Sequence, residues 1–170
     1  MDARFCSNCG ERLQLREIEG RTRAFCPSCD HIHYEQPKVG AGALIERDER
    51  LLLLQRTSEP FRRYWNLPAG YVEVDEAPAQ AAIREVNEET GLQVEVVALE
   101  NVYSYADDPR GNGVFVVYRC RVIGGALSES AEGIHPTYVA RDQIPDKLAG
   151  GGHDQAIRAW QQRAGAIAAR

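Results

Sequence analysis

One segment, residues 70–92, limits the possible folds of this chain more than any other. Within it Glu85, Glu88 and Glu89 stand at positions i, i+3 and i+4, which share one face of a helix. Three like charges on one face destabilise an isolated helix, whereas the aliphatic residues on the other side can pack on a sheet. The segment therefore predicts a helix over 77–90 that displays carboxylates for a cation.

The acidic face has two interpretations. Carboxylate oxygens suit hard cations such as Mg²⁺ or Mn²⁺, and Arg84 is placed to pair with Glu88 or Glu76 and so hold the carboxylates in orientation. The alternative is a solvated acidic helix face, which is the commoner origin of such a run. That alternative leaves the offsets of Gly70, Glu76, Arg84 and Gly91 unexplained, so we favour the metal-binding interpretation.

The spacing of these residues resembles the signature of the Nudix hydrolases, Gly-x5-Glu-x7-Arg-Glu-U-x-Glu-Glu-x-Gly-U, where U is aliphatic. The matching positions are Gly70, Glu76, Arg84, Glu85, Val86, Glu88, Glu89, Gly91 and Leu92. The resemblance covers residues 37–160. It implies an α/β fold, an α/β/α sandwich around a mixed sheet, in which the signature forms loop, helix and loop.

The resemblance also implies roles for individual residues. Glu85, Glu88 and Glu89 would bind catalytic Mg²⁺ or Mn²⁺, joined by the carbonyl of Gly70. Arg84 would pair with a neighbouring carboxylate. A water held by the metal ions would attack phosphorus, and the ions would stabilise the attacking and leaving oxygens.

The general base stays open at this point. Resembling enzymes use either a glutamate of the signature or one from a later loop. Glu88 and Glu89 are the candidates inside the signature. Glu129 and Glu132 precede a strand expected at 138–140, and Glu132 is our choice among the loop candidates, with a solvated loop residue as the alternative.

Four cysteines near the start of the chain form two CxxC pairs. Cys6 and Cys9 are followed after sixteen residues by Cys26 and Cys29, a spacing typical of a zinc ribbon whose two knuckles flank a β-hairpin. A redox dithiol is the alternative, but a single pair suffices for that chemistry. We expect a structural Zn²⁺ held by four thiolates, and an inert core thiol at Cys120.

Composition divides the chain into a zinc ribbon at 1–36 and a hydrolase domain at 37–170. Through position 38 the ribbon carries six basic and six acidic residues, and the whole chain has a net charge of −5. Binding to nucleic acid or to an anionic membrane favours a basic excess, so we expect neither partner. We expect a cytoplasmic protein, with the ribbon serving packing or dimerisation in a possible homodimer.

The second region alternates strand and helix signals. Besides the helix at 77–90, a terminal helix is expected from Asp154, as its cap, to about Ala168. A hairpin loop is expected at 47–50. The expected strands are 39–45, 51–54, 64–67, 94–99, 114–122 and 138–140.

A zinc ribbon ahead of the signature resembles the NADH pyrophosphatases and the plant-type ADP-ribose and FAD pyrophosphatases. The Ser-Gln-Pro-Trp-type motif of the NADH enzymes is replaced here by the sequence of residues 101–109. We therefore expect hydrolysis of ADP-ribose, FAD or a related dinucleotide, with AMP released from adenine substrates. The alternatives are a nucleoside triphosphate pyrophosphohydrolase and a non-catalytic module that senses nucleotides or binds nucleic acid.

Candidate substrate contacts follow from residue type alone. Tyr103 and Tyr105 are able to stack on a nucleobase, although alternating tyrosines also serve sheet packing. Arg62, Arg63 and Arg110 are able to clamp phosphates, although each also fits a plain surface charge.

Overall fold

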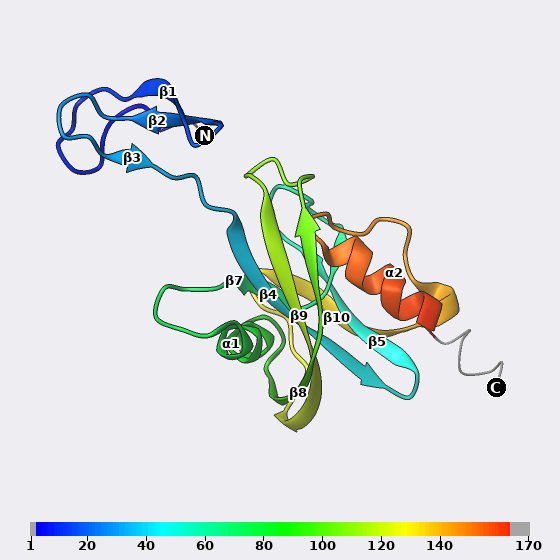
Figure 1. Ribbon diagram of the computed structural model, residues 1–170. Coiled ribbons are helices and arrows are strands. Elements are labelled where there is room, and N and C mark those ends of the chain that lie inside the picture. Colours follow the sequence, from blue (N-terminus) through cyan, green and yellow to red (C-terminus); the bar gives the residue numbers. More distant parts are fainter. Residues whose placement is uncertain (1–2, 164–170) are drawn as a thin grey trace. The chain divides into compact units, whose positions relative to one another are not determined.

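The computed structural model describes residues 3–163 of the chain. These residues belong to two compact units, Met1–Pro37 and Lys38–Arg170, both drawn in Figure 1. Along the described chain, no helix is long and apolar enough to cross a membrane.

The first unit is a small antiparallel sheet. Its strands, in the order β1-β2-β3, are β1 (Gln14–Ile18), β2 (Arg21–Phe25) and β3 (Ile32–His33). Glu19 and Gly20 connect β1 to β2, and both have positive φ, 54° and 73°. Such a two-residue turn matches the twist of a hairpin. The hairpin predicted between the two CxxC pairs is therefore present.

The second unit is built on a mixed sheet with the strand order β10-β5-β4-β9-β8 (Figure 1). Short strands β6 and β7 pair with β5 and β4. The pairing of β4 with β9 is parallel and the others are antiparallel. The strands are β4 (Lys38–Arg47), β5 (Arg50–Arg56), β6 (Trp65–Asn66), β7 (Ala69–Tyr71), β8 (Leu92–Tyr105), β9 (Gly113–Gly125) and β10 (Gly133–Ala140).

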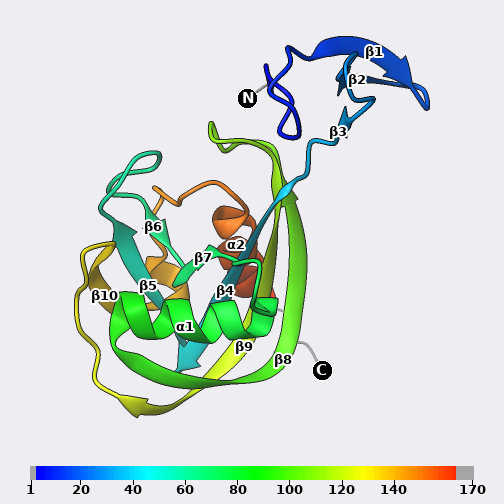
Figure 2. The ribbon, with the colours of Figure 1, turned by 90° about the vertical axis from the view of Figure 1, so that its left-hand side faces the viewer.

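Two helices, α1 (Pro78–Thr90) and α2 (His153–Arg163), cover opposite faces of this sheet (Figure 2). Strand residues alternate between the two faces because side chains have a period of two. Leu44 packs in the cluster that contains Trp160 of α2, whereas its neighbour Ile45 packs with Val86 of α1. The expected α/β/α sandwich with a mixed sheet is confirmed.

Helix α1 has sequence-encoded ends. Ala77 is the N-cap residue, and its backbone N–H donates a 2.9 Å hydrogen bond to the side-chain oxygen of Gln80. Pro78 occupies the first turn, where its missing N–H is harmless. Gly91 closes the helix with φ 71°, a left-handed conformation that suits glycine. The glutamate-bearing helix therefore begins and ends within one residue of its predicted bounds.

Several predicted boundaries differ from the observed ones. Strand β8 continues to Tyr105, well beyond the predicted end at 99. It stays paired with β9 over this whole length, although the register shifts at three places. The predicted loop at 47–50 is a two-residue turn, Asp48 and Glu49, since Arg47 already pairs with Arg50.

The second helix also starts earlier than expected. Helix α2 begins at His153, so Asp154 lies in its first turn and is not its cap. The buried Oδ1 of Asp154 has no hydrogen-bond partner within residues 3–163. The predicted end of the helix near Ala168 falls outside the described residues.

Candidate active site

A cavity of about 480 Å³ lies in the second unit and is lined by residues of both helices, five strands and the loops between them. Its lining residues are Gly40, Arg56, Thr57, Ser58, Phe61, Ala69, Gly70, Tyr71, Glu73, Glu85, Glu89, Tyr105, Asp108, Arg110, Phe115, Ala131, Glu132, Ala149, Gly150, Gly151 and His153. Acidic and basic side chains therefore line the same cavity.

Two glutamates of α1 form the acidic part of the cavity. Glu85 and Glu89 are only 8% and 4% exposed. The carboxylate of Glu89 accepts a 2.9 Å hydrogen bond from the backbone N–H of Ala69. Burial raises the pKa of Glu85, and it raises the pKa of Glu89 to about 8. Buried carboxylates of this kind favour either a proton or a cation close by.

Arg84 holds the acidic side chains in place. Its guanidinium donates hydrogen bonds to both carboxylate oxygens of Glu76, at 2.6 and 3.1 Å, and to the carbonyl of Tyr71 at 3.1 Å. It also donates to Glu85 at 2.7 Å and to Glu88 at 3.0 Å. The hydrogen bond from Arg84 keeps the pKa of Glu76 below its usual value. The pairing expected for Arg84 is thus present with three carboxylates.

The three glutamates of the acidic face differ in their burial and in whether they line the cavity. Glu85 and Glu89 line the cavity together with Gly70, whereas Glu88 does not, and its side chain is 57% exposed. A helix turns 100° per residue, so positions i, i+3 and i+4 share a face without sharing one depth of burial. Glu88 lies on the solvent side of that face, paired with Arg84.

The loop ahead of β10 brings one of its two glutamates to the cavity. Glu132 lines the cavity, and its negative charge is among the causes that raise the pKa values of Glu85 and Glu89. Thr57 anchors this loop: its hydroxyl donates to the carbonyl of Ala131 at 2.7 Å, and its backbone N–H donates to that of Glu132 at 3.2 Å.

Glu129, the other glutamate of that loop, is engaged elsewhere. Its carboxylate accepts a 2.8 Å hydrogen bond from the backbone N–H of His135 and lies 3.1 Å from that residue's Nδ1. Glu129 is not among the residues that line the cavity. Of the two loop candidates for a general base, only Glu132 therefore reaches the cavity.

A second part of the cavity is basic and was largely missed by sequence reasoning. Arg56, at the end of β5, lines it, and its buried Nε has no hydrogen-bond partner among the described residues. Burial, followed by the charge of Arg110, lowers the pKa of Arg56. Arg110 lines the cavity too, and the buried carboxylate of Asp108 holds it at 2.6 Å. A strand-terminal arginine after an apolar run was the available signal for Arg56.

Only some of the residues predicted to contact the substrate lie at the cavity. Tyr105 and Arg110 line the cavity. Tyr103 packs against the hydrophobic core under α2, and Arg62 and Arg63 are exposed residues outside the lining. The structure therefore brings two of these five residues to the site.

The acidic part of the cavity has the chemistry of a divalent cation site. Glu85 and Glu89 supply carboxylate oxygens, with Gly70 beside them and Glu132 close enough to influence their pKa values. A methyl group on the α-carbon of Gly70 would overlap the Glu85 carboxylate, so only glycine allows this approach. Hard oxygen ligands suit Mg²⁺ or Mn²⁺, and a cation would offset the charge of the two buried glutamates.

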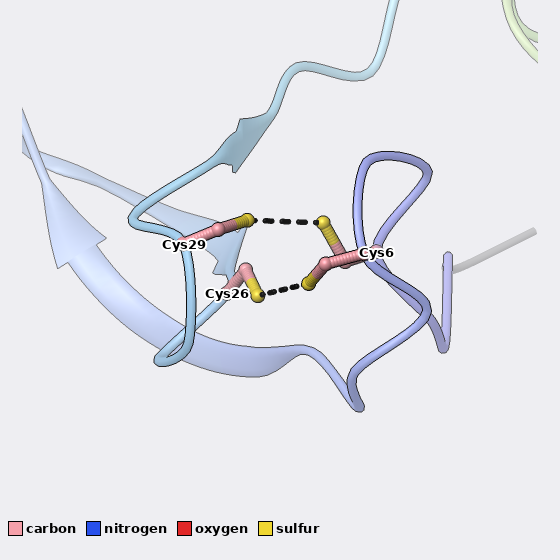
Figure 3. A group of neighbouring side chains, drawn as sticks. Cys6, Cys26 and Cys29 are labelled. Atoms are coloured by element: carbon pink, nitrogen blue, oxygen red, sulfur yellow. Dashed lines mark hydrogen bonds between the residues drawn. The ribbon is translucent and has the colours of Figure 1, made fainter.

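The first unit holds a separate cluster of four cysteines. One ligand atom from each of Cys6, Cys9, Cys26 and Cys29 lies within 4.8 Å of the others. Figure 3 shows the sulfurs facing one another, with Cys6 and Cys29 3.6 Å apart and Cys9 and Cys26 3.5 Å apart. All four are free thiols, because a disulfide requires sulfurs about 2.05 Å apart.

The two CxxC knuckles have matching backbone geometry. Gly10 donates a 2.9 Å hydrogen bond to the carbonyl of Cys6, and Asp30 donates one of 3.0 Å to that of Cys26. Both donors have positive φ, 77° and 57°. Sulfurs at the corners of a tetrahedron around zinc lie about 3.8 Å apart, close to the distances here. The cluster therefore fits a tetrahedral zinc site.

Comparison with known proteins supports both units. The model of the NUDIX domain matches residues 36–160, and the model described as Nudix N-terminal, a zinc ribbon, matches residues 4–35. A crystal structure of a NUDIX hydrolase from Nitrosomonas europaea is 34% identical, with a TM-score of 0.82 over 96% of this chain and 93% of that one.

Two curated relatives extend this comparison. An ADP-ribose pyrophosphatase from Methanocaldococcus jannaschii is 38% identical over 117 residues, 68% of this chain and 69% of the relative. The NAD-capped RNA hydrolase NudC from Pseudomonas aeruginosa is 36% identical over 91 residues, but these make up only 32% of its length. With its signature helix, its cavity and these matches, the chain belongs to the Nudix hydrolase family.

Proposed function

We propose that this chain hydrolyses the diphosphate of ADP-ribose or a related dinucleotide such as FAD, releasing AMP from adenine substrates. The observation that carries the proposal is the juxtaposition, in one cavity, of two buried glutamates with Arg56, whose buried Nε has no hydrogen-bond partner among residues 3–163. The similarity to an ADP-ribose pyrophosphatase over two thirds of both chains supports this substrate class.

Glu85, Glu89 and the carbonyl of Gly70 would hold Mg²⁺ or Mn²⁺ in this proposal. A divalent cation there supplies Lewis-acid stabilisation of the negative charge on a diphosphate. Glu88 joins these ligands only if its carboxylate leaves Arg84. The hydrogen bond from Ala69 and the ion pair with Arg84 keep Glu89 and Glu85 in position.

Arg56 and Arg110 recognise the diphosphate. Arg56 lines the same cavity as Glu89 and Asp108, and the negative charges of both carboxylates partly offset the lowering of its pKa by burial. A buried Nε–H without a partner, as in Arg56, is unfavourable, and a bound phosphate oxygen would supply the missing hydrogen bond. Asp108 orients Arg110 through both carboxylate oxygens.

Glu132 acts as the general base. It is the loop glutamate that reaches the cavity, and Thr57 holds its backbone. In this role it accepts a proton from the water that attacks phosphorus. A bond from the water oxygen to phosphorus forms, the bond from phosphorus to the bridging oxygen breaks, and two phosphate products leave.

The first unit serves as a structural zinc ribbon, with Cys6, Cys9, Cys26 and Cys29 as ligands. Four thiolates close the coordination sphere of zinc, so this site leaves no position for a substrate. We place the boundary between ribbon and hydrolase domain at residues 36 and 37. A role of the ribbon in packing or in a homodimer remains part of this proposal.

The test is a hydrolysis screen with Mg²⁺ and with Mn²⁺. The panel contains ADP-ribose, FAD, NADH, NAD⁺, diadenosine polyphosphates and nucleoside triphosphates, with products separated by chromatography. We expect ADP-ribose or FAD to be preferred and AMP to appear. Glu89→Gln should reduce turnover by about 10²-fold or more, since it removes a charged ligand. Glu95→Gln, an exposed change outside the cavity, is the matched control.

A preference for nucleoside triphosphates with release of pyrophosphate would replace this proposal with the triphosphatase alternative. Absence of turnover on the whole panel by folded protein would support a nucleotide-sensing module instead.

A further inference from the structure

His153, the first residue of α2, lies in the basic part of the cavity and has no place in the mechanism above. It lines the cavity, and its ring packs against that of Phe115, with the centroids 4.5 Å apart and the planes tilted by 46°. Gly152 makes this contact possible, because a Cβ there would come within 2.9 Å of Phe115. This packing holds the imidazole of His153 in the lining of the cavity.

The imidazole has an unfulfilled hydrogen-bonding capacity. His153 is 8% exposed, and its Nδ1 is buried without a hydrogen-bond partner among residues 3–163. Because His153 lines the cavity and its Nδ1 is buried, a ligand in the cavity would contact the ring through Nε2. A phenylalanine would pack against Phe115 without burying an unpaired nitrogen, so packing alone does not account for histidine here.

The ring is uncharged at physiological pH. Burial lowers the pKa of His153 to about 3, and the positive charges of Arg56 and Arg110 act in the same direction. A neutral imidazole donates one hydrogen bond and accepts another. It is therefore suited to an uncharged polar group, whereas the two arginines are suited to phosphate oxygens.

We propose that His153 is a specificity-determining residue that hydrogen-bonds a sugar hydroxyl of the substrate, next to the diphosphate held by Arg56 and Arg110. The inference rests on the proposed dinucleotide substrate and refines it. A hydroxyl is able either to donate a hydrogen bond to Nε2 or to accept one from it, so it suits either neutral tautomer, and the phenol of Tyr105 adds a second uncharged polar group to the cavity lining. Either the nucleoside ribose or the second sugar is able to supply this hydroxyl.

The test measures binding by isothermal titration calorimetry without divalent cations, so turnover is not needed. Three probes are compared: ADP-ribose, the β-methyl ester of ADP, which lacks the second sugar, and ADP-ribose with a 2′,3′-dideoxyadenosine half. His153→Phe keeps the ring on Phe115 and removes both nitrogens. His153→Asn restores a polar group, and His153→Leu replaces His153→Phe if that variant does not fold.

We expect His153→Phe to raise the Kd for ADP-ribose about tenfold, the effect of one lost hydrogen bond in an enclosed site. The Kd for one truncated probe should stay unchanged, and that probe identifies the sugar. His153→Asn should recover most of the loss.

Equal changes for all three probes, no change for ADP-ribose, or no binding of ADP-ribose by the unaltered protein would each overturn the inference. The proposed function is judged separately by hydrolysis with Mg²⁺. If the Kd pattern holds but the unaltered protein does not cleave ADP-ribose, the sugar contact stands and only the proposed reaction is wrong.

Discussion

The α-carbon of Gly70 lies directly against the carboxylate of Glu85, so that any side chain at position 70 would overlap it. Gly70 is the middle residue of β7, and Glu85 lies in α1, fifteen positions further along the chain. The glycine is required here by this close approach, since its φ is not in the left-handed region.

This contact makes Gly70→Ala a sharp test of the site. We expect the variant to lose at least about tenfold in turnover and about 1–3 kcal/mol in the free energy of unfolding, as overpacking typically does. Gly124→Ala is the matched control, because Gly124 does not line the cavity and a Cβ there would meet the exposed side chain of Gln93. The Glu85 carboxylate, in contrast, is buried and held by Arg84. Similar activity of both variants would contradict the proposed importance of the contact between Gly70 and Glu85.

The assignment of the general base is tested by a pair of glutamates from one loop. Glu132→Gln should lower kcat by about 10²-fold with little change in thermal stability, because it removes only the proton acceptor. Glu129→Gln should leave kcat within about twofold, because its carboxylate binds His135 outside the cavity. Steady-state kinetics with saturating Mg²⁺ provides the measurement. A larger loss in Glu129→Gln than in Glu132→Gln would reverse the assignment.

The phosphate-binding role of Arg56 has its own control in an exposed arginine. Arg56→Gln should raise KM for ADP-ribose by about 10–100-fold, since hydrogen bonds to charged groups contribute about 1.5–3 kcal/mol. Arg62→Gln should leave KM unchanged because Arg62 does not line the cavity. An equal rise in both variants would indicate that a general electrostatic effect, rather than a specific contact, attracts the substrate.

The zinc assignment is tested by metal analysis of the purified protein. We expect about one zinc ion per chain, and Cys26→Ser should remove most of it because Cys26 is a buried member of the four-cysteine cluster. Cys120→Ser should retain full zinc content, since Cys120 is not in the cluster. A folded ribbon without zinc would refute the assignment.

Burial of His153 predicts a pH dependence of stability. Its pKa in the folded protein, about 3, lies below the value of 6.5 expected in the unfolded chain. Between these values the unfolded state binds the additional proton, so the free energy of unfolding should fall as pH decreases from 6.5 towards 3. The slope from this group is at most about 1.4 kcal/mol per pH unit.

Comparison with His153→Phe isolates this contribution from those of the carboxylates. The stability difference between the two proteins, measured by chemical denaturation at several pH values, should shift in favour of the variant as pH falls below 6.5. A difference that is independent of pH would show that His153 is protonated as readily in the folded protein as in the unfolded chain.

Much of the site was predictable because its signals are local. The spacing of Glu85, Glu88 and Glu89 indicates one helix face, and Pro78 and Gly91 mark the ends of that helix. The CxxC pairs likewise predicted the cysteine cluster, since each knuckle is a short turn with its own backbone hydrogen bonds.

The basic part of the cavity was not predictable from such signals. Arg56 ends β5, Asp108 lies in the loop between β8 and β9, and His153 begins α2, so only the packing of these elements brings the three together. Arg56 follows an apolar strand and Arg62 does not, but this local signal does not show that Arg56 lines the cavity while Arg62 is exposed. The extent of β8 was missed for the same reason: its length follows from the pairing partner that β9 provides.

The sequence by itself determined the family, the glutamate-bearing helix and the four-cysteine cluster, since these depend on residues within a few turns of one another. The tertiary structure alone decided that Glu89 is buried while Glu88 is exposed, and that Glu132 rather than Glu129 reaches the cavity. It also decided that the buried Nε of Arg56 has no hydrogen-bond partner in the described part of the chain. Burial and long-range contacts depend on the packing of whole elements against one another, which no local pattern of residues encodes.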